Sequence, residues 1–458
     1  MRPHGCFVEP ALLTGAGTGQ TTARLREDMR EGRGVKAYGA KAWTIWTLGA
    51  LAFGYAFFQR VAPSVMVSDL MRDFAVGAAV LGNLSALYFY PYVVLQVPLG
   101  ILTDRIGARI VLSGAMALAA AGTLIFGTAG GIGEAYVGRF LVGMGSAACF
   151  IATLSLSSRW FPPHRFAFLA GMCMFFAMAA GVGGQAPLAA LIEVTGWRAA
   201  MVGSACFAGA LALVAAIVVR NRPPDAPPAR SAATDWAGLG RDLKLIFLNG
   251  EVWLIALVAT ALSGVMLAFG GLWGVPYMMV RYGLARPEAA ALVSLILVGW
   301  ALGAPFGGWL SDAVKRRKAP LVATSAASCL LAVLLFHGPP LPLVACAVLI
   351  VVLGLVGGSM VSTYALAREV TPPGTHATVT GLVNAMTVAA GAVLQPAVGF
   401  LLDLNWAGGM AEGARVYTQA TYETAFLSIV GWAAMGLVAS LFLRETYCRP
   451  MVTEAAAG

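Results

Sequence analysis

Charged side chains are scarce in this sequence. Asp, Glu, Lys and Arg make up 11% of its 458 residues, whereas soluble globular proteins contain about 25%. Hydrophobic residues account for 59% of the chain. So little charge cannot cover the surface of an ordinary soluble protein, which excludes that class. The composition indicates a chain that passes repeatedly through a lipid bilayer.

Catalytic and metal-binding motifs are also absent. The sequence contains no Gly-x-Ser-x-Gly, HExxH or GxxxxGK[ST] pattern. It therefore lacks the motifs typical of a lipase, a zinc protease and an ATP-driven pump. Its seven cysteines form no CxxC pair and have no Cys/His ligand spacing. We therefore expect no enzyme activity, no metal and no cofactor.

Long apolar runs make up most of the chain, and a helix needs about 20 apolar residues to cross a bilayer. Lysines and arginines gather in alternate loops between these runs. The positive-inside rule then predicts an inner-membrane protein with both termini in the cytoplasm. This distribution accounts for the net charge of +9 without nucleic acid as a partner. The twelve predicted crossings are residues 43–67, 78–102, 109–130, 135–157, 166–192, 199–219, 251–279, 289–310, 319–337, 341–366, 377–402 and 423–443.

Charge and proline divide the chain into regions. Residues 1–41 are basic, lack a secretory signal and are predicted to form a disordered cytoplasmic tail. Residues 221–250 begin Asn-Arg-Pro-Pro-Asp and cannot lie in hydrocarbon, which indicates a cytoplasmic linker. Six-helix bundles are predicted on either side of it, at residues 42–220 and 251–446, followed by a cytoplasmic tail at 447–458.

The two halves share four landmarks in register. Asp104 and Asp312 lie 208 positions apart. Such a repeat predicts an all-α membrane fold of two pseudo-symmetric bundles, with a central cavity between them as the natural binding site. The other landmarks recur 210 positions later: Pro162-Pro163, Gly171 and Gln185 become Pro372-Pro373, Gly381 and Gln395.

Charged loops and one buried arginine carry a family resemblance. The loop Gly100-Ile-Leu-Thr-Asp-Arg-Ile-Gly-Ala-Arg109, its copy from Gly308, and Arg139 followed by Gly143 and Gly145 resemble the major facilitator superfamily over residues 42–446. The resemblance implies a secondary transporter that moves a small-molecule substrate through the bilayer by alternating access. It also implies twelve helices and a monomer.

Three further stretches narrow the resemblance. Residues 58–65 (Phe-Gln-Arg-Val-Ala-Pro-Ser-Val), 81–90 and 96–100 are similar to the branch that contains bacterial phagosomal amino-acid transporters and lysosomal dipeptide transporters. This favours an amino acid or short peptide as substrate. The alternative within the superfamily is a drug or metabolite exporter. The stretch 181–187 weakens this alternative, because it does not match the Gly-Pro motif of drug antiporters. A non-transporting membrane receptor or scaffold is the alternative from another class.

The charged loop is predicted to be a breakable cytoplasmic latch. Asp104 can pair with a cation or cap a helix. In the superfamily this loop stabilises the outward-facing state, and the competing interpretation is that its arginines only fix topology. The resemblance carries the gating role to Gly100, Asp104, Arg105, Gly107 and Arg109, and to Gly308 and Asp312 in the second copy.

Arg60 is the most informative charge inside a predicted crossing. An arginine in a bilayer costs roughly 2.5–3.5 kcal/mol on insertion scales and therefore needs a partner or a task. One interpretation is that it binds a substrate carboxylate through two parallel hydrogen bonds. The other is that it snorkels to the outer headgroups. Nearby Pro63 indicates a kinked helix.

Further residues are candidates for the cavity wall. The superfamily counterpart of Arg139 faces the cavity, while a structural pair with Glu134 is the alternative. An aromatic stripe reflects helix packing more often than a ligand site, and helix packing is therefore the competing interpretation of these residues. The predicted substrate-binding residues are Tyr55, Arg60, Tyr88, Tyr92, Arg139, Trp273, Tyr277 and Asn384.

No aspartate or glutamate is predicted at mid-depth in the membrane. Proton-coupled carriers commonly place a titratable carboxylate there. Symport through a central acid is therefore poorly supported. Uniport, or coupling to a proton or another ion elsewhere in the protein, stays open.

Overall fold

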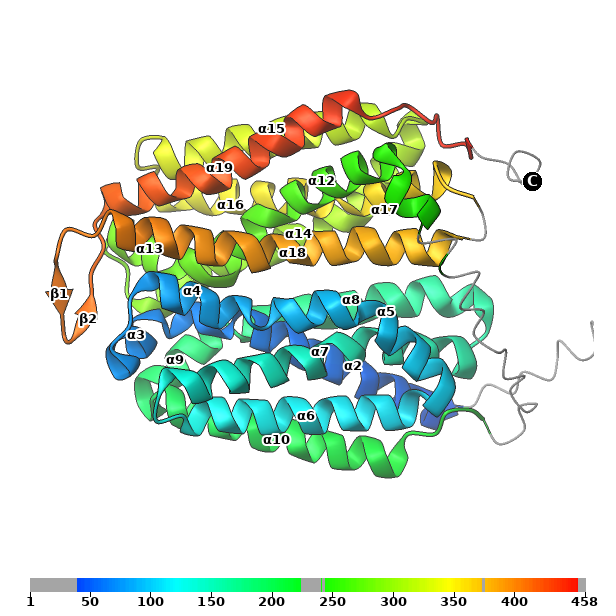
Figure 1. Cartoon of the computed structure of the whole chain (residues 1–458), viewed down its shortest axis with the longest axis horizontal. Helices are drawn as coiled ribbons and strands as arrows, with labels where there is room; N and C mark the ends of the chain where they lie inside the picture. The colour runs from blue at the N-terminus through cyan, green and yellow to red at the C-terminus, as the bar shows by residue number, and fades with distance from the viewer. Residues whose placement is uncertain (1–38, 224–239, 241–243, 373–374, 452–458) are drawn as a thin grey trace, which may run out of the picture.

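The computed structural model describes residues 39–223, 240, 244–372 and 375–451. Most of the predicted tails, and much of the predicted linker, lie outside these residues. Figure 1 shows long, roughly parallel helices in two bundles, the amino-terminal half (residues 39–223) and the carboxy-terminal half (residues 244–451). We call the end where both described termini lie the termini side, and the opposite end the far side.

The amino-terminal half consists of helices broken at short, specific points. Its elements are α2 (Gly39–Val61), η2 (Ala62–Val65), α3 (Val67–Phe74), α4 (Ala78–Ala86), α5 (Phe89–Ile106), α6 (Ala108–Thr128), α7 (Ile132–Trp160), η3 (Pro163–Arg165), α8 (Phe166–Gly183), α9 (Ala186–Thr195) and α10 (Trp197–Val218).

The carboxy-terminal half repeats this arrangement and adds a small hairpin. Its elements are α12 (Gly250–Val265), η4 (Met266–Trp273), α13 (Gly274–Tyr282), α14 (Arg286–Val314), α15 (Lys318–His337), α16 (Leu343–Gly358), α17 (Val361–Glu369), α18 (His376–Leu404), β1 (Met410–Ala411), β2 (Ala414–Arg415) and α19 (Gln419–Phe442). The two strands pair antiparallel, with Met410 opposite Arg415.

Eleven helical spans are long and apolar enough to cross a membrane, and the number is twelve when one bent pair is counted. That pair is residues 39–65 with 67–74, bent by 68°. The cause is Pro63, which cannot continue the backbone hydrogen-bond ladder, so α2 ends at Val61 and a 3₁₀ turn follows. The predicted fold class is confirmed, and the first crossing bends near its predicted end instead of running straight to residue 67.

The segment η4 is a stretch of π-helix in the middle of a crossing. The wider turn changes the pairing of backbone carbonyls within the helix. Two glutamines bind carbonyls there: Gln185 donates to the oxygen of Gly270 at 2.6 Å, and Gln395 donates to that of Leu267 at 2.7 Å. These are the glutamines that the sequence places in register, one from each half.

The halves are joined most firmly at the far side. Arg286 at the start of α14 pairs with Asp69 of α3, with 2.7 Å between Nη1 and Oδ2. The Asp403 carboxylate at the end of α18 accepts hydrogen bonds from the first backbone N–H groups of α4, those of Ala78 (3.1 Å) and Ala79 (2.9 Å). A carboxylate at a helix amino terminus is favourable because of the helix dipole and the unpaired N–H groups.

The loop between α18 and α19 reinforces this closure. Tyr417 donates a hydrogen bond to Asp403 and accepts one from the Ala78 N–H. Burial and the neighbouring Asp403 carboxylate raise the pKa of the Tyr417 hydroxyl, which therefore remains a donor. Arg415 holds the same carboxylate at 3.0 Å. The hairpin that carries Arg415 lies beside α3, so it contacts the opposite half (Figure 1).

Candidate functional site

Arg60 lies at the end of α2, inside a cage of aromatic rings. Its side chain is only 5% exposed. The guanidinium carbon lies 4.2 Å from the ring centre of Phe57, 5.3 Å from that of Tyr92 and 5.6 Å from that of Tyr88. Aromatic faces attract a cation and hold its plane in position. Arg60 therefore does not snorkel to the surface, and that interpretation is wrong.

The guanidinium of Arg60 has no acidic partner. No ion pair joins it to another described residue, and its Nε is enclosed without an acceptor. The groups that interact with it are the neutral hydroxyls of Tyr88 and Tyr92. A buried charge without a partner is costly, and guanidinium binds a planar carboxylate through two parallel hydrogen bonds. The arrangement leaves Arg60 able to accept an anion.

A second unpaired guanidinium lies directly behind the first. Arg139 of α7 is 1% exposed and donates only one hydrogen bond, from Nη1 to the carbonyl of Gln59 at 2.9 Å. Its Nε and Nη2 have no acceptor among the described residues. The alternative pair with Glu134 is wrong, because no ion pair joins the two described residues, and the Glu134 carboxylate instead accepts the Gly130 N–H at 2.7 Å.

Tyr88 lies between the two arginines. Its ring centre is 5.6 Å from the Arg60 guanidinium and 5.4 Å from that of Arg139, and its hydroxyl donates to the carbonyl of Ala56 at 2.9 Å. Arg139 is thus enclosed within the amino-terminal half rather than facing the seam between the halves. It adds positive potential behind Arg60 without contacting the seam itself.

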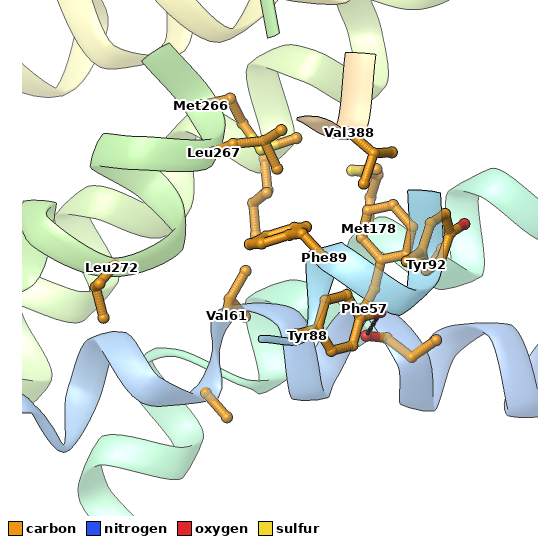
Figure 2. Close-up of a cluster of buried hydrophobic side chains, with 14 of the residues drawn as sticks. Phe57, Val61, Tyr88, Phe89, Tyr92, Met178, Met266, Leu267, Leu272 and Val388 are labelled. Carbon is orange, nitrogen blue, oxygen red and sulfur yellow. Dashed lines mark hydrogen bonds between the residues drawn. The ribbon is translucent and has the colours of Figure 1, made fainter. Parts of the chain in front are cut away.

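The aromatic rings that surround Arg60 belong to a larger cluster of apolar side chains from both halves. Figure 2 shows this seam cluster: residues of α2, α4–α5 and α8 face residues of η4 and α18. An apolar surround lowers the local dielectric, which strengthens the pull of Arg60 on any anion that reaches it. The labelled members are Phe57, Val61, Tyr88, Phe89, Tyr92, Met178, Met266, Leu267, Leu272 and Val388.

The carboxy-terminal half supplies neutral polar groups near this point. Tyr364 of α17 donates to Asn384 of α18, with 3.1 Å between Oη and Oδ1. Tyr92 lies close enough to interact with both Tyr364 and Gln96. Asn384 is one helical turn from Val388 of the seam cluster. The central site therefore combines a cation on one side with amide and hydroxyl groups on the other.

Three predicted substrate residues lie elsewhere. The Tyr55 hydroxyl bonds Thr123 and the amide of Gln59, inside the amino-terminal half. Trp273 is fully buried and donates to the Gln395 carbonyl. Tyr277 is also fully buried and donates to the Phe336 carbonyl. The structure places Tyr55 and Tyr277 within the packing of single halves, whereas the Trp273 ring lies beside Gly399, where α18 meets α4 of the other half.

Three residues of the site were not among the predicted ones. Phe57 and Phe89 complete the cage around Arg60, and Tyr364 pairs with Asn384. Phe57 lies one helical turn before Arg60, so helical spacing could have identified it. Phe89 and Tyr364 are ordinary members of apolar runs and carried no such signal.

The predicted latch loop is held within its own half. Gly107 has φ of +89° and begins α6, a backbone conformation that glycine adopts without strain. Arg109 donates to the Ala216 carbonyl of α10 at 2.6 and 2.9 Å. Asp104 makes a long contact of 3.4 Å with Arg159 and is 81% exposed. Gly100 lies in α5, with open space where a side chain would project.

The second copy of the loop is more tightly bonded. Arg317 pairs with Asp312 at 2.7 Å and with Glu369 at 2.9 Å, all inside the carboxy-terminal half. Lys315, which corresponds to Gly107, has φ of +55°. Gly308 lies in α14, with no atom within 4 Å of an added Cβ. In the first copy of the loop, Arg105 is likewise held by an interaction with another residue.

We expect Asp104→Asn to reduce transport while leaving the stability of this conformation unchanged. An exposed ion pair contributes about 0–1 kcal/mol, so its loss here costs little. If Asp104 forms its ion pair only when the termini side closes, the neutral asparagine cannot form that pair, and the closed conformation is destabilised. The measurements are thermal unfolding and solute uptake in liposomes, with Glu193→Gln as an exposed control. Normal uptake by Asp104→Asn would remove the latch role.

Comparisons with known proteins agree with this architecture. The model of the Major Facilitator Superfamily matches residues 48–396 and 274–451. A bacterial homologue of the human lysosomal transporter Spinster, solved in an inward-facing and unoccupied conformation, superposes with a TM-score of 0.71 at 17% identity, covering 88% of this chain and 98% of that one. At this identity the likeness concerns the fold.

Two curated relatives share part of the sequence. The probable sulfoacetate transporter SauU of Cupriavidus necator is 23% identical over 290 residues, which is 59% of this chain and 65% of the relative. The membrane sensor protein UhpC of Escherichia coli is 26% identical over 316 residues, 63% of this chain and 68% of the relative. Across three curated relatives the aligned part spans 40% to 68% of their length. This multi-pass membrane protein belongs to the Major Facilitator Superfamily.

Proposed function

We propose that this protein is a secondary transporter of small organic anions that carry a carboxylate or sulfonate group. The observation that carries the proposal is the caged guanidinium of Arg60, which has no acidic partner among the described residues. An anionic solute is the partner that would compensate this charge. The relative named as a probable sulfoacetate transporter supports the same class of solute.

Amino acids and short peptides are a narrower version of this proposal. Their carboxylate suits Arg60, but their ammonium group also needs an acceptor. The described acidic residues near the bundle ends, such as Asp69, Asp403 and Glu423, bond neighbouring groups there. Tyr364 and Asn384 offer only neutral oxygens, so a hydroxyl group suits the second end of the solute better than a charge does.

The bonds between the halves indicate to which side of the membrane this conformation opens. The printed ion pairs and side-chain hydrogen bonds that cross between the described parts of the two halves lie at the far side and in mid-membrane. With the termini in the cytoplasm, as the positive-inside rule favours, this conformation is inward-facing in a bacterial inner membrane. Rocking of the halves would expose Arg60 to each side in turn.

A thermal-shift screen of the purified protein tests the class of solute. We expect lactate, sulfoacetate and related anions to raise the unfolding temperature, since a ligand at a hundred times its Kd stabilises by about 2.7 kcal/mol. The matched control is the neutral amide of each acid, such as lactamide. Equal stabilisation by acid and amide, or none by any anion, would contradict an anion site at Arg60.

A receptor that binds without transporting is the second candidate. The relative named as a membrane sensor protein favours it. Counterflow in liposomes distinguishes the two functions, because only a carrier accumulates labelled solute in exchange for unlabelled solute trapped inside. Stabilisation by an anion without counterflow would support the receptor.

A further inference from the structure

A second cavity lies between the halves at the far side, separate from the site at Arg60. Its volume is about 200 Å³. One wall comes from η2 and α3 of the amino-terminal half, and the other from α13, the start of α14 and the strand β2 with the residues after it. Because both halves contribute walls, the cavity exists in this form only while the far side is closed.

Two arginines line this cavity and have donors to spare. Arg286 uses Nη1 to bind Asp69, and Arg415 uses Nη1 to bind Asp403. No other hydrogen bond from either guanidinium is found among the described residues, although a guanidinium presents several N–H donors in a planar fork. The Arg415 guanidinium also stacks on the ring of Trp406, with 4.4 Å between its carbon and the ring centre, which leaves its N–H edge to hydrogen bonds. An anion can therefore use the remaining N–H donors of both groups without breaking either ion pair.

The other residues that line the cavity indicate the size and polarity of a ligand that would fit it. Ser68 is exposed and its hydroxyl has no hydrogen bond to another described residue. The other side chains are mostly apolar, among them Val65, Met71, Val275 and Met279. A volume of about 200 Å³ is far larger than a single water requires, so the space admits a small organic molecule. A short aliphatic carboxylate matches this size, charge and apolar lining.

We propose that the far-side cavity is a binding site for a short aliphatic carboxylate, and that its occupation holds the far side closed. A ligand that binds one conformation shifts the population toward it by its differential affinity. The carboxylate lies against Arg286 and Arg415, and its chain contacts α3 of the other half. An anion on the far side thus inhibits transport at a site distinct from Arg60.

Hexanoate is a suitable probe, tested on the full-length protein with Arg60→Gln, which lacks the central anion partner. We expect hexanoate to raise the unfolding temperature of this variant in a saturable way. Adding Ser68→Trp, which fills the mouth of the cavity, is expected to abolish the shift. Ser158→Trp is the matched control, an exposed serine on the termini side of α7, and should leave the shift unchanged.

A fatty acyl lipid could present the same chemistry as a free carboxylate. The shift is therefore measured in neutral detergent, with hexanoate in one arm and micelles containing phosphatidylglycerol in the other. A shift with hexanoate alone supports a free anion. A shift with the anionic lipid alone overturns the proposal in favour of a lipid site.

Transport provides the second readout. In liposomes, uptake by the wild type is expected to fall at high far-side hexanoate, without recovery at high substrate, and this inhibition should disappear in Ser68→Trp. No hexanoate shift in Arg60→Gln would overturn the second site and leave the central one intact. A response of Arg60→Gln to hexanoate without any response of the wild type to substrate anions would instead overturn the proposed function.

Discussion

Replacing Arg60 by lysine is expected to weaken solute binding by about tenfold to a hundredfold. A hydrogen bond to a charged group contributes about 1.5–3 kcal/mol, and lysine keeps the charge but loses the planar fork and its position among the rings of Phe57, Tyr88 and Tyr92. The measurement is the solute concentration that gives half-maximal thermal stabilisation, compared with the half-saturation of counterflow.

The control for this substitution is Arg444→Lys. Arg444 is 74% exposed on the termini side, so the same chemical change there should leave affinity untouched. Comparable unfolding temperatures without solute would show that Arg60→Lys remains folded. If Arg60→Lys bound solute as tightly as the wild type, a paired hydrogen bond from this arginine would not be part of recognition.

Replacing Gly399 by alanine is expected to shift the protein strongly toward a far-side-open conformation. A Cβ at this position would lie 2.3 Å from the carbonyl oxygen of Ala78, across the contact between α18 and α4. The obstructing atom is backbone and cannot rotate away. Overpacking typically costs about 1–3 kcal/mol, which corresponds to a roughly fivefold to hundredfold change in the ratio of the two conformations.

Distances between spin labels at Ser68 and Val280 report this shift, because these residues lie on opposite walls of the far-side cavity. The labels are introduced after replacement of the exposed Cys206. Gly381→Ala is the control, since it lies in the same helix with open space around it. An unchanged distance distribution in Gly399→Ala would show that close approach of α4 and α18 does not limit closure.

The sequence predicted the crossings and the repeat, and it singled out Arg60, whose role stays a prediction. Apolar runs of bilayer length and loop charges are strong signals, because hydrocarbon excludes charge and unsatisfied backbone. Arg60 could be singled out because a charge in an apolar run needs an explanation. Asn384 gave a similar, weaker signal, and it lies beside the seam cluster.

The sequence could not predict in the same way whether an aromatic side chain points toward the central cavity, a neighbouring helix or lipid. Lipid-facing and buried surfaces of a membrane helix are both apolar, so apolar periodicity does not say which face points inward. Tyr55 and Tyr277 therefore matched a cavity stripe as well as a true cavity residue would, although each packs within one half. The cage around Arg60 needs α4–α5 beside α2, a tertiary relation that no local pattern contains.

The irregular turn η4 contacts both halves, so the proposed rocking movement has a consequence for it. When the far side opens, Gln185 departs with the amino-terminal half, while Gln395 remains beside its partner Leu267. The Gly270 carbonyl then has to find an N–H within its own helix. We therefore expect the wide turn to lose one of its two supports when the bundles rock apart, so that the pitch of this helix differs between the two conformations.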